Sequence, residues 1–135
     1  MLFTIQRLYA LTIYLLRELI RATSRGQFFE YKARVILAWA EGNLVAAAAL
    51  TISVATGHPM ALLRPTGMFV GLGCVVGAVF YYANGQAERR LLPRFESEFA
   101  QLKTANRMMG TIIVLLLIAL TAAAAIEAAF VARGL

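Results

Sequence analysis

Apolar residues in this chain gather in long runs that are separated by shorter polar segments. A helix needs about 20 mostly apolar residues to cross the hydrocarbon core of a bilayer. Three runs come close to this length: residues 35–57, 66–83 and 109–132. The second run is rich in glycine and ends in Tyr81 and Tyr82, whose rings suit the headgroup level. The pattern predicts an all-α integral membrane protein with three transmembrane helices.

The first 24 residues have an amphipathic pattern instead. At about 100° per residue, most of the polar side chains fall on one face of a helix. That face consists of Gln6, Arg7, Ala10, Tyr14, Arg17, Glu18 and Arg21. The other face is apolar and includes Leu2, Ile5 and Leu8, which is typical of an interfacial helix. The alternative is a four-helix transmembrane bundle. We disfavour it because the uninterrupted apolar stretch covers only residues 8–16, and Arg7 at mid-depth would cost roughly 2.5–3.5 kcal/mol.

A polar segment, residues 84–107, separates the second and third apolar runs. Within it Phe95, Phe99 and Leu102 recur at helical spacing, opposite Glu96 and other polar residues. This spacing predicts an amphipathic helix at about residues 94–107, beginning after Pro93 and lying on the cytoplasmic membrane surface.

Composition and charge agree with a membrane protein. Hydrophobic residues make up 61% of the chain, more than the roughly one-half of a soluble domain. The net charge is +6, but the Lys and Arg residues flank the apolar runs, where they set orientation rather than bind nucleic acid. Only Arg64 and Arg133 lie on the side opposite the basic clusters. We therefore expect one membrane domain over residues 1–135, multi-pass in the cell inner (plasma) membrane, with basic segments cytoplasmic and a retained N-terminus.

Motifs for catalysis or cofactor binding are absent from the sequence. The chain has no Asp, so a Ser-His-Asp triad cannot form, and no nucleophile elbow or phosphate loop occurs. Cys74 is the single cysteine and His58 the single histidine, which excludes an intramolecular disulfide, clustered metal ligands and a bis-His haem site. We expect no enzyme activity, no metal and no cofactor.

Three polar side chains fall inside the predicted spans: Glu41, Asn43 and Glu127. Glu41 is expected near the inner surface, within reach of Arg34 or of the interface itself. Glu127 is expected near the outer surface, with His58, Arg64 or Arg133 as its partner, so the two carboxylates should not form one site. Asn43 lies about 200° around the helix from Glu41. The first span therefore presents polar groups on two faces, and each face needs a partner in lipid.

The second span contains two successive GxxxG motifs, Gly67 with Gly71 and Gly73 with Gly77. Such pairs open a groove into which another helix can pack closely. Packing against the first span and association with another chain both satisfy this pattern. A basic cluster of Arg89, Arg90 and Arg94 follows the same span, and it suits anionic lipid headgroups, an acidic partner or orientation alone.

These features favour an interaction protein. We expect a small non-catalytic membrane subunit or accessory protein that packs in a larger homo- or hetero-oligomeric assembly. Its partners would be membrane lipids and either further copies of itself or other membrane subunits, and not nucleic acid. The alternative is a pore-forming or ion-conducting oligomer, of the effector or holin-like kind, in which Glu41 or Glu127 lines a water-filled path.

Overall fold

The computed structural model describes residues 1–24, 28–57 and 66–133, with the side chains of 66–70 and 133 left aside. The described chain is all-helical, as predicted, and has no strand. Its four helices are α1 (Leu2–Thr23), α2 (Phe29–Thr56), α3 (Thr66–Ala100) and α4 (Thr104–Arg133). Helix α2 ends where the sequence indicates, because Gly57 adopts a left-handed conformation with φ of 66°.

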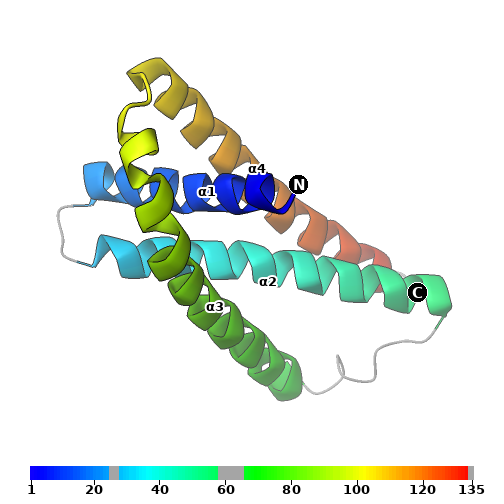
Figure 1. Ribbon diagram of the computed structural model, residues 1–135. Helices are drawn as coiled ribbons and strands as arrows, with labels where there is room; N and C mark the ends of the chain where they lie inside the picture. Colours follow the sequence, from blue (N-terminus) through cyan, green and yellow to red (C-terminus); the bar gives the residue numbers. More distant parts are fainter. Residues whose placement is uncertain (25–27, 58–65, 134–135) are drawn as a thin grey trace.

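Helices α1 and α2 lie side by side and run in opposite directions, with α3 crossing in front of the pair and α4 behind it (Figure 1). Helices α3 and α4 each pack on both members of the pair. The first half of α3 diverges from α2 towards its N-terminal end (Figure 1). The described helices are therefore packed together around α1, and towards the other end of the molecule α4 stays on α2 while α3 leaves it.

Two helices, Phe29–Thr56 and Thr104–Ala132, are long and apolar enough to cross a membrane. Only 22% and 6% of their most apolar windows are buried, whereas the core helix of a soluble protein would be mostly covered. Both contain runs that the sequence predicts to span. The third predicted span, residues 66–83, lies within α3, and the side chains of its first five residues fall outside the described part of the structure.

The predicted helix over residues 1–24 is present as α1, but the assignment of its faces is partly wrong. Ala10 and Tyr14, on the predicted polar face, are buried, whereas Leu2 and Leu8 are exposed. Helices α2, α3 and α4 all pack on α1. The core therefore includes Ala10 and Tyr14 from the face that was predicted to be polar. The other described helices leave Leu2 and Leu8 uncovered.

The predicted boundary at Pro93 is also wrong. Helix α3 continues through Pro93 to Ala100, and the separate helix expected at about 94–107 does not form. A proline inside a helix removes a backbone hydrogen bond and costs about 3 kcal/mol. Burial of Leu92, Phe95 and Phe99 on the same helix offsets this cost. A short turn follows Ala100, and residues 104–107 form the first turn of α4.

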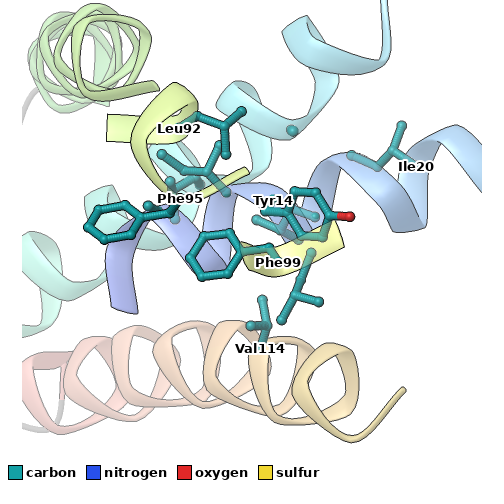
Figure 2. Packing of buried hydrophobic residues seen from close by; sticks show 12 residues of the cluster. Tyr14, Ile20, Leu92, Phe95, Phe99 and Val114 are labelled. Carbon is teal, nitrogen blue, oxygen red and sulfur yellow. The ribbon is translucent and has the colours of Figure 1, made fainter. Parts of the chain in front are cut away.

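The aromatic residues of α3 form the centre of the core (Figure 2). Phe99 is 1% exposed, and its ring lies 5.8 Å from that of Phe95 and 5.6 Å from that of Tyr14 on α1. Helix α4 approaches closely because position 110 is glycine. A Cβ there would lie 2.8 Å from the Leu15 side chain of α1. The C-terminal part of α3 is thus a structural part of the bundle.

Candidate functional site

Polar side chains from three helices meet where α1, α2 and α3 cross. Tyr9 of α1 donates a hydrogen bond to Glu41 Oε1 of α2 at 3.1 Å, and it also contacts the side-chain oxygen of Asn84. Asn84 of α3 donates from Nδ2 to Glu41 Oε2 at 2.8 Å. Both oxygens of the Glu41 carboxylate therefore have a donor, and Asn84 is buried with 1% exposure.

A second polar contact lies one turn further along α3. The side chain of Glu88 is 6% exposed and bridges two cations, with Oε1 3.1 Å from Arg17 Nη1 and Oε2 2.5 Å from Arg34 Nε. Arg17 also pairs with Glu30 at 2.7 Å. The Arg34 side chain also lies beside Gly85, and a Cβ there would be in ordinary van der Waals contact with it at 3.6 Å. Glu88 thus links α1, α2 and α3.

These two polar clusters follow one another along the same three helices. On each helix the polar residues are separated by about one or two helical turns, so they share a face. We call this set the junction network: Tyr9, Arg17, Arg34, Glu41, Asn84 and Glu88. Its carboxylates are occupied by hydrogen bonds and ion pairs within the chain. The arrangement joins the three helices through their side chains.

Only Glu41 of this network was singled out from the sequence, and its expected partner was wrong. Arg34 pairs with Glu88, while Glu41 accepts hydrogen bonds from α1 and α3. The spacing of residues along α3 could have identified Asn84 and Glu88 as members of the network. Asn84 and Glu88 continue the same helical face as the apolar residues Leu92, Phe95 and Phe99. Polar residues on an apolar face indicate buried partners.

An open apolar groove of about 820 Å³ lies between α2 and the first half of α3. Small residues line both walls, with Gly42, Ala46 and Ala49 on α2 and Gly73 and Gly77 on α3. Three aromatic side chains line the same groove: Tyr31, Trp39 and Tyr81. The structure leaves the groove between these walls unfilled.

The GxxxG glycines do not pack closely within the chain. A Cβ at Gly71, Gly73 or Gly77 would have no neighbouring atom within 4 Å. Gly67 lies outside the part of α3 whose side-chain surroundings are described. Packing of these glycine faces against α2, one of the two possibilities raised by the sequence, is therefore not seen at the three described positions.

Asn43 also lines the groove and does not join the junction network. Its side-chain nitrogen is shielded from solvent and has no hydrogen-bond partner among the described residues. An unpaired amide donor in an apolar setting costs about 1–3 kcal/mol. The sequence predicts that Asn43 and Glu41 need hydrogen-bond partners on different helices. That prediction stays untested for Asn43.

Glu127 lies apart from Glu41. It is exposed and borders a small hollow of about 330 Å³ beside Ala47 and Thr51 of α2. These two residues are about 9–15 Å along α2 from Glu41 at 1.5 Å per residue. The partners expected for Glu127, which are His58, Arg64 and the side chain of Arg133, fall outside the described residues.

Arg89, Arg90 and Arg94 are exposed on the second half of α3. Within the described ranges the ion pairs use other cations, namely Arg7, Arg17, Arg21 and Arg34. The same ranges contain no group of three His, Cys, Asp or Glu side chains able to hold a metal ion. Comparison of the chain with protein-family models, curated proteins and solved structures finds no match.

Proposed function

We propose that this chain is a small non-catalytic membrane subunit that packs with other helices in a larger homo- or hetero-oligomeric assembly. The observation that carries the proposal is the unfilled groove between α2 and α3, whose glycine positions have open space where a Cβ would be. In lipid, helices associate through close van der Waals contact between small residues. The walls of this groove have that composition.

The proposed topology has three spans, formed by α2, the first half of α3 and α4. In this arrangement the junction network and the second half of α3 lie on the cytoplasmic side, where positive charge is favoured. The network then joins the helices just beyond Tyr81 and Tyr82, at the level of the membrane interface. In the bilayer α4 stays packed along α2, whereas the first half of α3 diverges from α2. The groove between α2 and α3 then faces lipid or another helix.

The chemistry of the carboxylates supports a non-catalytic role. Glu41 and Glu88 are held by donors on other helices, and their partners are the groups that keep α1, α2 and α3 together. A general base must instead be within hydrogen-bond reach of a substrate proton. We therefore assign the network to structure and the groove to interaction.

The assembly is tested by filling the groove. We expect Gly73→Leu and Gly77→Leu to leave the fold of the single chain intact, because nothing within 4 Å opposes a Cβ at either position. The same substitutions should reduce the native mass of the complex extracted from membranes to that of one chain, since leucine occupies the space that another helix needs. Helical content by circular dichroism and native mass are the two measurements.

Val79→Leu is the matched control, because Val79 is 62% exposed on the same helix and does not line the groove. It should change neither measurement. The proposal fails if the unmodified chain is a monomer over a wide concentration range and crosslinking in membranes captures no partner. An assembly that keeps its mass in both glycine variants would place its contacts elsewhere and reject the groove.

A further inference from the structure

The outward face of α3 carries three kinds of side chain in a fixed order along the helix. Val75, Val79 and Tyr82 come first and are 61%, 62% and 69% exposed. Arg89, Arg90 and Arg94 follow and are also exposed. Apolar, aromatic and basic groups succeed one another in the order of hydrocarbon, interface and headgroup region on a lipid-facing helix.

Helical geometry places these residues on one side. At about 100° per residue, the three arginines lie within an arc of about 140°, and Val75, Val79 and Tyr82 project into the same arc. The opposite side of α3 is the buried one and carries Asn84, Glu88, Leu92, Phe95 and Phe99. The basic face is thus the face that no other described helix covers.

Distances along α3 match the thickness of the membrane interface. Arg89 and Arg90 lie about 10–12 Å beyond Tyr82 at 1.5 Å per residue, and Arg94 lies about 18 Å beyond it. Helix α3 crosses α2 at an angle (Figure 1). If α2 runs along the membrane normal, the heights above the membrane are therefore smaller than these distances. Long arginine side chains also extend towards the interface from such positions. The guanidinium groups therefore reach the level of lipid phosphates when Tyr82 is at the interface.

Charge pairing separates these arginines from the others. Arg17 and Arg34 are paired with Glu88, and Arg7 with Glu98. The ion pairs of the described residues leave Arg89, Arg90 and Arg94 without a carboxylate. Glu96 is exposed on the same helix but projects about 90° away from the centre of the basic face, and it lies about two turns beyond Arg89. Three unneutralised guanidinium groups on one face suit an anionic ligand with several oxygen acceptors.

We propose that Arg89, Arg90 and Arg94 form a binding site for the headgroups of anionic phospholipids in the cytoplasmic leaflet. This inference rests on the proposed membrane location of α3. A lipid is favoured over an acidic protein because the basic residues continue the exposed apolar and aromatic stripe of the same helix face. A lipid contacts both parts of that face at once, with its acyl chains beside Val75 and Val79 and its phosphate beside the arginines.

The test is lipid retention by the full chain in mild detergent. The protein is titrated with phosphatidylglycerol or with phosphatidylcholine, and bound lipids are counted by native mass spectrometry. We expect at least tenfold tighter retention of phosphatidylglycerol, because each basic residue near an anionic surface adds several-fold in affinity. The triple variant R89Q/R90Q/R94Q should lose this preference. Glycerol phosphate at the same concentration should not displace the lipid, because it lacks the acyl chains.

A second triple variant, R21Q/K32Q/K103Q, removes the same net charge from exposed positions elsewhere and should keep the preference. Equal loss in both variants would show a general charge effect and overturn the site. Displacement by glycerol phosphate would overturn a lipid site in favour of a free phosphate ester. Retention of an acidic protein in place of lipid would also overturn it. Native mass in the same spectra reports the assembly separately, so lipid binding and the proposed function can fail independently.

Discussion

Glu88→Ala is expected to lower the free energy of unfolding by about 3–5 kcal/mol, because it leaves two partly buried arginines without their shared carboxylate. Arg17 retains Glu30 as a partner, whereas Arg34 loses its ion pair. Three helices meet at this position, so the loss should reduce the cooperativity of the whole junction. Unfolding of the detergent-solubilised protein by denaturant, followed by circular dichroism, measures the effect.

Glu96→Ala is the matched control for this prediction. Glu96 lies about two turns from Glu88 on the same helix, is exposed and takes part in none of the ion pairs among the described residues. Its replacement should change stability by no more than about 0.5 kcal/mol. Equal, small effects of the two substitutions would contradict the network as a stabilising feature. Restoration of stability by Arg34→Leu in the Glu88→Ala background would show that the unpaired cation is the cost.

The second large effect is expected from Phe99→Ala, at about 3–5 kcal/mol, which is the usual cost of removing a buried phenylalanine. Phe99 is 1% exposed and contacts the rings of Tyr14 and Phe95 (Figure 2). The alanine variant leaves a cavity between α1 and the end of α3. The measurement is again the free energy of unfolding, with retention of native helical content checked first.

This variant also decides between two positions for the end of α3. If residues 94–107 lay on the membrane surface, Phe99 would contact lipid, and its truncation would weaken membrane contact with little effect on unfolding. Phe130→Ala provides the comparison, because Phe130 is 69% exposed on α4. A difference of less than about 1 kcal/mol between the two variants would contradict the packing of Phe99 in the core.

Much of the helical architecture is predictable because the pattern of apolar residues is local information. The runs at 35–57 and 109–132 lie inside α2 and α4, and Gly57 ends α2 as its backbone freedom allows. The boundary at Pro93 was misplaced for a reason that is not local. The helix-breaking tendency of proline is offset by the burial of three neighbouring side chains, and only their contacts with α1 and α4 reveal that burial.

The side-chain pairs of the candidate site could not be predicted from the sequence. Glu41 stands out as a carboxylate within an apolar run, but its partners Tyr9 and Asn84 are 32 and 43 residues away. The ion pair of Arg34 with Glu88 spans 54 residues. Pairing across such separations depends on how helices cross, and helix periodicity alone does not give the crossing. Helical spacing puts Asn84 and Glu88 on the face of Phe95 and Phe99, but only the structure shows that this face is buried.

The apolar runs predicted a helical chain with three spans, and the structure contains two helices, α2 and α4, that are long and apolar enough to cross a membrane. Helical spans are expected because backbone groups in lipid must pair within each helix. The sequence by itself also marked the glycines and the three arginines of α3. Tertiary structure alone decided that Glu88 bridges Arg17 and Arg34, that Glu41 faces Tyr9 and Asn84, and that the glycine faces stay open. These outcomes depend on the angle at which α3 crosses the α1–α2 pair, which brings some distant residues together and holds others apart.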